Sequence, residues 1–153
     1  MKNTNEILQL TDEIEIIEAI GTNVWNKKQE SDNLTPAETT FVLIDIFEGA
    51  MNEGGFHYFF NGETGSFARE IVNAYKDIAA PKTANIIAKA IGLFGVNNYS
   101  EDTVKRQNAI NKLDEKAISG WEDLDELFFN DEQEEDIVAL IVAYIRNNPT
   151  AFN

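Results

Sequence analysis

The chain has 153 residues, and its 27 acidic and 12 basic residues give a net charge of −15. Apolar residues make up 43% of the chain, which excludes a disordered protein, and the absence of cysteine excludes disulfides and thiolate metal sites. The negative electrostatic field of such a protein repels nucleic acid and acidic membrane surfaces and attracts basic proteins. The composition therefore predicts a basic protein as partner, with no direct binding to nucleic acid or membrane.

The negative charge is concentrated at the two ends of the sequence. Residues 1–63 carry 12 acids and 3 bases, residues 64–113 carry 4 acids and 7 bases, and residues 114–153 carry 11 acids and 2 bases. The start lacks the basic-then-apolar order of a secretion signal, and no apolar run approaches the about 20 residues that cross a bilayer. We expect a cytoplasmic protein.

Apolar residues recur at spacings of three and four along most of the chain, which is the period of an amphipathic helix. The first helix is predicted to bury one stripe, formed by Ile7, Leu10, Ile14, Ile17, Gly21 and Val24. The second begins at Thr35, with Pro36 in its first position and Glu38 completing a capping box. Its buried row is predicted to be Phe41, Ile44, Phe47 and Met51.

Two adjacent glycines are predicted to end this second helix, because a left-handed helix cap favours glycine. The following residues then form a loop that dips aromatic rings into the core. We assign six residues of this segment to the fold: Gly54, Gly55, Phe56, Tyr58, Phe59 and Asn61. The alternative is a small-molecule enzyme with its cleft at this loop, in which His57 or Tyr58 is the polar group.

Further helical segments are predicted over residues 67–78, 82–94 and 100–118, and around Trp121. The third of these is expected to start at a Ser100 cap. The last helix is expected to start at a capping box of Asp131 and Glu134, and to lie at the centre of the bundle because residues 137–145 are apolar nearly all round. The predicted fold class is all-α, with a single compact domain of about seven helices over residues 1–153.

Residues 54–61 carry the pattern G-G-F-x-Y-F-x-N, and Gly65 follows. This pattern resembles the signature of a bacterial all-helical family that is named for a DNA-mimic protein, and the resemblance covers about residues 34–145. Glu53 stands where the family usually has asparagine, and His57 stands where glutamine is frequent. The resemblance implies an acidic protein that imitates duplex phosphates and occupies the DNA-binding face of a transcription factor.

The segment 114–136 is the predicted partner-binding surface, with 11 acids and one base. As one helix of about 35 Å it would carry about one net charge per 3.5 Å, close to the one per 3.4 Å of a single DNA strand. A second row would come from the acids near residues 12–18 or from a twofold partner, so a homodimer is permitted. The residues expected to meet the partner are Glu122, Asp123, Asp125, Glu126, Asp131, Glu132, Glu134 and Glu135.

Two other interpretations of the acidic surface remain open. The chain could be an immunity-like or regulatory protein whose basic partner does not bind nucleic acid, or the acids could serve solubility alone. No catalytic residue, cofactor or metal site is predicted, since His57 is the only histidine and the phosphate-binding glycine motifs and the EF-hand ligand spacing are missing. The expected partner is a basic protein, with a DNA-binding transcription factor as the leading candidate.

Overall fold

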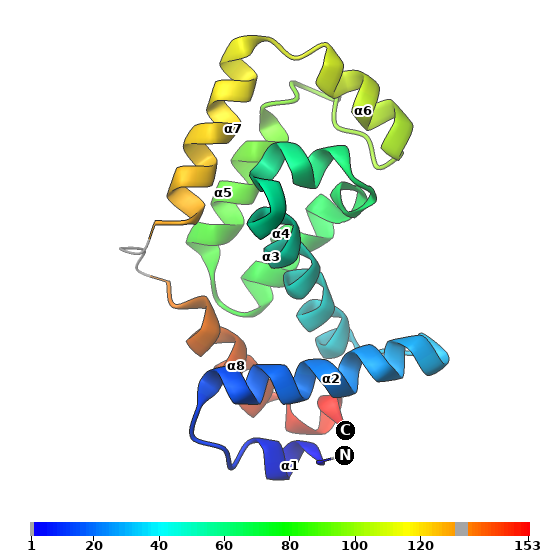
Figure 1. Cartoon of the computed structure of the whole chain (residues 1–153), viewed down its shortest axis with the longest axis vertical. Helices are drawn as coiled ribbons and strands as arrows, with labels where there is room; N and C mark the ends of the chain where they lie inside the picture. Colours follow the sequence, from blue (N-terminus) through cyan, green and yellow to red (C-terminus); the bar gives the residue numbers. More distant parts are fainter. Residues whose placement is uncertain (1, 131–134) are drawn as a thin grey trace.

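The computed structural model describes residues 2–130 and 135–153, which form eight α-helices and two 3-10 helices without a strand. The longest helix, α3 (Pro36–Asn61), runs between two groups of helices (Figure 1). The other elements are α1 (Thr4–Ile7), α2 (Glu13–Ser31), η1 (Glu63–Phe67), α4 (Ala68–Asp77), α5 (Pro81–Gly92), α6 (Thr103–Asn111), α7 (Glu115–Phe128), α8 (Ile137–Asn147) and η2 (Pro149–Phe152). The all-α prediction is confirmed.

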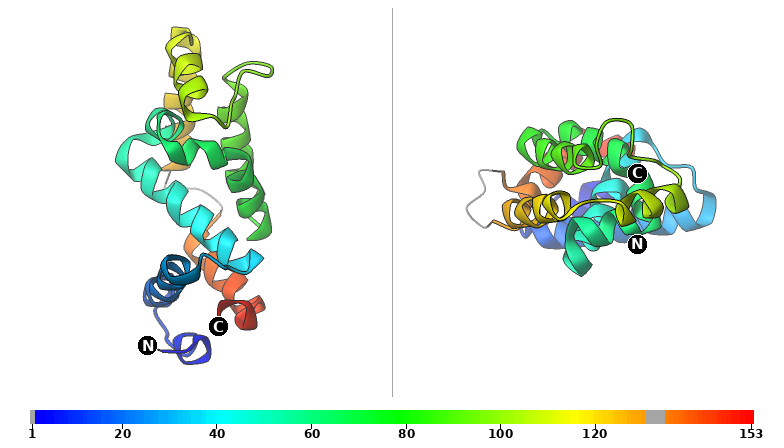
Figure 2. Two further views of the ribbon diagram at one scale, coloured as in Figure 1. Left: turned by 90° about the vertical axis from the view of Figure 1, so that its right-hand side faces the viewer. Right: turned by 90° about the horizontal axis from the view of Figure 1, so that it is seen from above.

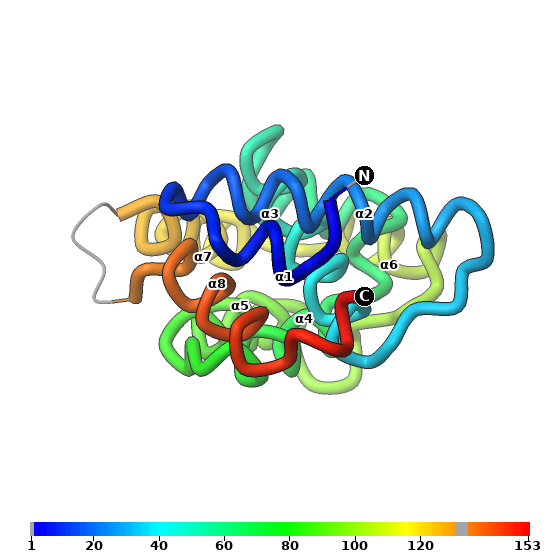
Figure 3. Tube along the Cα trace, turned by 90° about the horizontal axis from the view of Figure 1, so that it is seen from below, coloured from blue at the N-terminus to red at the C-terminus, as the bar shows by residue number. Residues whose placement is uncertain are grey.

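Two hydrophobic clusters hold the helices together. The larger lies between α3, α4, α5 and α7, and the smaller joins α1, α2 and α8 to the first turns of α3. Figure 2 shows the two groups at opposite ends of the molecule, with both chain termini at the same end. There the Thr4 hydroxyl donates to the Phe152 carbonyl at 2.9 Å, and α1 and α2 lie close to the C-terminal segment (Figure 3).

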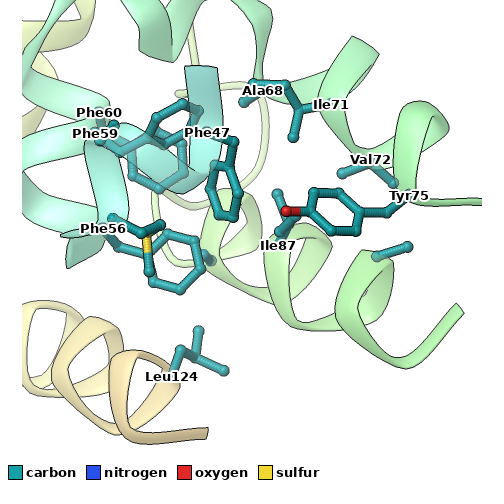
Figure 4. Packing of buried hydrophobic residues seen from close by; sticks show 14 of the residues in the cluster. Phe47, Phe56, Phe59, Phe60, Ala68, Ile71, Val72, Tyr75, Ile87 and Leu124 are labelled. Carbon is teal, nitrogen blue, oxygen red and sulfur yellow. The ribbon is translucent and has the colours of Figure 1, made fainter. Parts of the chain in front are cut away.

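Phe47 lies at the centre of the larger cluster and is fully buried (Figure 4). Its ring centroid is 5.0 Å from that of Phe59, 5.4 Å from Phe128 and 5.8 Å from Tyr75, each in an edge-to-face arrangement that aromatic rings favour. The buried row predicted for this helix is confirmed: Phe41, Ile44, Phe47 and Met51. The capping box is confirmed too, since Thr35 and Glu38 each accept a hydrogen bond from the other's backbone N–H.

The N-terminal segment is two helices, not one. The Asp12 carboxylate accepts hydrogen bonds from the backbone N–H groups of Ile14 and Glu15 and caps α2. Because the helix is interrupted between α1 and α2, the helical spacing of apolar residues that starts at Ile7 does not continue into α2. The predicted stripe is therefore wrong at Ile14, which is half exposed, and the buried residues of α2 are Ile16, Ile20 and Val24.

The predicted segment 100–118 also divides into two helices. Asp102, not Ser100, caps α6 and accepts from the backbone N–H of Lys105 at 2.9 Å. Asp114 then caps α7 by accepting from the backbone N–H of Ala117 at 2.8 Å. Each break falls at an aspartate whose carboxylate satisfies a first-turn amide, which is a strong helix-start preference.

The last helix begins later than predicted and lies elsewhere. Asp136 caps α8 by accepting from Ala139 N–H, and the proposed capping box of Asp131 and Glu134 lies outside the described residues. α8 packs beside α2 at one end of the molecule, not at the centre, and its fully buried residues are Val142 and Ile145. No helix in the described parts of the chain is long and apolar enough to cross a membrane.

Candidate partner-binding surface

α7 presents a row of acidic side chains to solvent. With 3.6 residues per turn, Glu115, Glu122 and Glu126 fall within a narrow arc of this helix. The opposite face carries Trp121 and Leu124, which are buried against the larger cluster. All three glutamates are exposed, as is Asp123 on the flank of the row.

The spacing of this row follows from the helix rise. At about 1.5 Å per residue, Glu115 and Glu122 are about 10 Å apart along the axis, and Glu122 and Glu126 about 6 Å. These distances are about three and two steps of a DNA strand. α7 ends at Phe128, however, so the helical spacing does not extend over the whole acidic segment 114–136. The row therefore carries one carboxylate for about every two to three phosphate steps of a DNA strand.

The exposed acids of α7, namely Glu115, Glu122, Asp123 and Glu126, make no ion pair among the described residues. The ion pairs found between described residues join Lys27 to Glu38 at 2.8 Å and Lys28 to Asp32 at 2.8 Å. The first pair joins α2 to the start of α3, the second lies at the C-terminal end of α2, and neither involves a carboxylate of α7. The anionic row is thus not neutralised by an ion pair within the described part of the molecule.

Asp125 lies on α7 but faces inward. Its Oδ1 accepts a hydrogen bond from the backbone N–H of Phe56 at 2.9 Å, which ties α7 to the middle of α3. Burial raises the pKa of the Asp125 carboxyl, against the lowering effect of the bond from Phe56, and the neighbouring Glu122 raises it further. The structure therefore gives Asp125 a positioning contact inside the protein, while its predicted contact with a partner stays a prediction.

Glu135 caps a helix that is remote in sequence. Its carboxylate accepts from the backbone N–H groups of Lys82 and Thr83 at 2.8 and 2.7 Å, and from the Thr83 hydroxyl at 2.8 Å. The N-cap position of α5 is Ala80, which has no side-chain acceptor, so Glu135 supplies the missing one. The other predicted partner-binding residues of this stretch lie outside the described residues: Asp131, Glu132 and Glu134.

The glycine pair of the signature kinks α3 and does not end it, which corrects the predicted loop. Gly54 and Gly55 leave helical geometry, and the helix resumes to Asn61. Gly55 has φ 71° and ψ −160°, a backbone region open almost only to glycine. A Cβ on Gly54 would lie 2.6 Å from Cβ of Tyr58, and one on Gly55 would lie 2.7 Å from Cγ of Asp125. Both positions therefore exclude a side chain.

The aromatic residues after the kink divide between core and surface. Phe56 and Phe59 are fully buried, as predicted for residues of the fold, whereas Tyr58 is 53% exposed. The Asn61 side chain is exposed, and its backbone carbonyl accepts from the Gln107 amide at 2.8 Å. Asn61 therefore contacts the rest of the fold through its backbone carbonyl and not through its side chain.

Arg106 is a buried residue that the sequence analysis missed. Its guanidinium donates to the carbonyls of Phe60 and Gly62 at 2.6 Å each, and to that of Ser100 at 2.9 Å. Desolvation by burial lowers its pKa. Arg106 lies four residues before Ile110 and thus on the same helix face, which was the available signal. It ties α6 to the end of the signature segment.

The enzyme alternative required a pocket beside His57 and Tyr58. A groove of about 570 Å³ does lie at the kink, lined by Tyr58, Trp25 and Glu53, but His57 is not part of it. His57 instead packs edge-on against Trp121, with ring centroids 6.0 Å apart. Among the described residues, no group of three or more histidine, aspartate or glutamate side chains is arranged to hold a metal ion.

In the comparison with known proteins, a family profile described as DMP19-like protein matches residues 32–148. Neither the curated proteins nor the solved structures contain a match to the chain. The matched range contains the kink, Arg106, the α7 row and the whole of α8, and it extends slightly beyond the 34–145 expected from the signature. Because the profile covers well over half of the sequence, this chain belongs to the DMP19-like protein family.

Proposed function

We propose that this chain is a non-enzymatic, acidic binding protein that covers the basic DNA-binding face of a transcription factor or another nucleic-acid-binding protein. The observation that carries the proposal is the exposed row of Glu115, Glu122 and Glu126 on α7, in a member of the DMP19-like family. Asp123 adds a fourth exposed carboxylate beside the row. A net charge of −15 supports the same partner class, because it favours encounter with a basic surface.

The rigid placement of the row supports binding at a defined surface. Trp121 stacks on Phe60 with ring centroids 5.0 Å apart and donates its indole N–H to the Ala90 carbonyl at 2.9 Å. These contacts fix α7 against α3 and α5, so binding a partner does not have to order the backbone that carries the carboxylates. In this proposal, the α7 surface is recognised through its pattern of negative charge.

The proposal is tested by capture of partners from a native lysate at low salt, followed by elution with salt or with duplex DNA. We expect a basic nucleic-acid-binding protein that elutes steeply between low and moderate salt and is displaced by DNA. A captured partner that is acidic, or one that DNA never displaces, contradicts the proposal. A basic partner that has no affinity for DNA would instead support the immunity-like alternative.

A further inference from the structure

A second surface feature lies away from the α7 row. A groove of about 650 Å³ opens between α2, α3, the end of α7 and α8. Apolar side chains line its walls, among them Ile14 and Ile17 from α2, Ile137 and Val138 from α8, and Phe129 after α7. Ile14 is 50% exposed and Phe129 47%, and the first turn of α8 is only partly buried. A concave groove with exposed apolar side chains on several walls can receive apolar side chains of a partner.

Carboxylates accompany this apolar surface. Asp45, Glu48, Glu135 and Asp136 line the groove, and no lysine, arginine or histidine does so among the described residues. Each carboxylate accepts a hydrogen bond from within the protein, as Asp45 does from the Trp25 indole at 2.8 Å. Their orientation is therefore fixed in the free protein.

The charge of the groove decides which occupant it fits. A second copy of this chain would bring a net charge of −15 against four carboxylates, which is unfavourable unless bases compensate it. A helix with apolar residues on one face and lysine or arginine beside them satisfies both features, since its apolar face fills the groove while its bases meet the carboxylates. A volume of about 650 Å³ accommodates several such side chains.

We propose that the groove between α2, α3 and α8 binds a basic amphipathic helix of the partner protein by its apolar face. This inference rests on the proposed function only in taking the partner to be basic. It adds a contact that imitation of phosphate charge alone does not supply. The α7 row then contributes charge, and the groove contributes apolar burial and the orientation of the bound helix.

The test uses a fluorescein-labelled peptide of leucine and lysine, about 14 residues long, with its leucines on one helical face. A peptide of the same composition with dispersed leucines is the control, and fluorescence polarisation measures both affinities. We expect the amphipathic peptide to bind at least about tenfold more tightly. Ile14→Lys should weaken its binding about tenfold, whereas Val104→Lys, a matched change at a 65% exposed position on α6, should not.

Phe129→Ser provides a second groove variant in case Ile14→Lys disturbs α2, and circular dichroism checks the fold of each. Equal affinity for the two peptides, or equal binding by the Ile14 and Val104 variants, overturns the inference. So does a dimer of the wild-type protein, seen by sedimentation, that Ile14→Lys dissociates, because the occupant is then a second copy. DNA displacement that depends on α7 and not on Ile14 would leave the proposed function standing and remove this inference alone.

Discussion

Replacement of Gly55 by alanine tests the physical basis of the family signature. Gly55 occupies a backbone region that costs about 1–3 kcal/mol for other residues. The added Cβ would also collide with the Asp125 carboxylate and break its bond to the Phe56 N–H, a contact with a charged group that contributes about 1.5–3 kcal/mol. Gly55→Ala should therefore destabilise the protein by about 4 kcal/mol, a large part of the stability of a typical domain.

Gly49→Ala is the matched control on the same helix. Gly49 is exposed and helical, and nothing lies within 4 Å of a Cβ at that position. This change should stabilise the protein by about 0.5–1 kcal/mol. Urea unfolding followed by circular dichroism measures both free energies. A cost below about 1 kcal/mol for Gly55→Ala would refute the kink as a requirement of the fold.

A double mutant separates the two components of the cost. In an Asp125→Ala background the collision is absent and the hydrogen bond is already lost, so Gly55→Ala should cost only the backbone strain of about 1–3 kcal/mol. Additive costs of the two changes would show that the contact between Gly55 and Asp125 does not matter.

Three further changes address polar side chains that form hydrogen bonds within the fold, and each is measured by urea unfolding. Arg106→Met should destabilise the protein by about 3–5 kcal/mol, because it leaves buried carbonyls without a donor. Glu135→Ala should cost about 1–2 kcal/mol through loss of the α5 cap. Burial raises the pKa of Glu48, against the hydrogen bond from Tyr75, so its ionised form opposes folding. The stability of Glu48→Gln relative to the wild type should therefore increase as pH rises above about 4.3, the ordinary pKa of glutamate. Below that pH the difference in stability between the two proteins should not change with pH.

These three predictions have distinct contrary outcomes. A cost below about 1 kcal/mol for Arg106→Met would mean that water satisfies the carbonyls. No loss in Glu135→Ala would mean that solvent caps α5 equally well. A relative stability of Glu48→Gln that is independent of pH, or that falls as pH rises, would contradict a folded-state pKa above the unfolded one.

Local signals in the sequence predicted the elements whose determinants are adjacent residues. The capping box at Thr35 and Glu38, with Pro36 between them, marked the start of α3, and its row from Phe41 to Met51 followed the helical period. The breaks before α2 and α7 were missed because aspartate caps interrupt apolar patterns that look continuous.

Contacts between distant residues account for most of the rest. Gly55 suits a helix cap as well as a kink, and only the approach of Asp125, from α7, distinguishes the two. Glu135 caps α5 from more than fifty residues away, which no local pattern indicates. The position of α8 was misjudged because an apolar sequence shows that a helix is apolar and not which neighbours cover it.

If the α7 acids meet the DNA-binding face of a basic partner, they compete with DNA for that face. The direct measurement is a mobility-shift assay in which this chain releases DNA from the captured partner. Two triple variants with the same change in charge are compared: Glu122→Gln, Asp123→Asn, Glu126→Gln on α7, and Glu63→Gln, Glu70→Gln, Glu101→Gln at exposed positions elsewhere. The α7 variant should lose DNA release at least about tenfold while the other variant retains it, and an equal loss in both would contradict a specific role of the α7 acids.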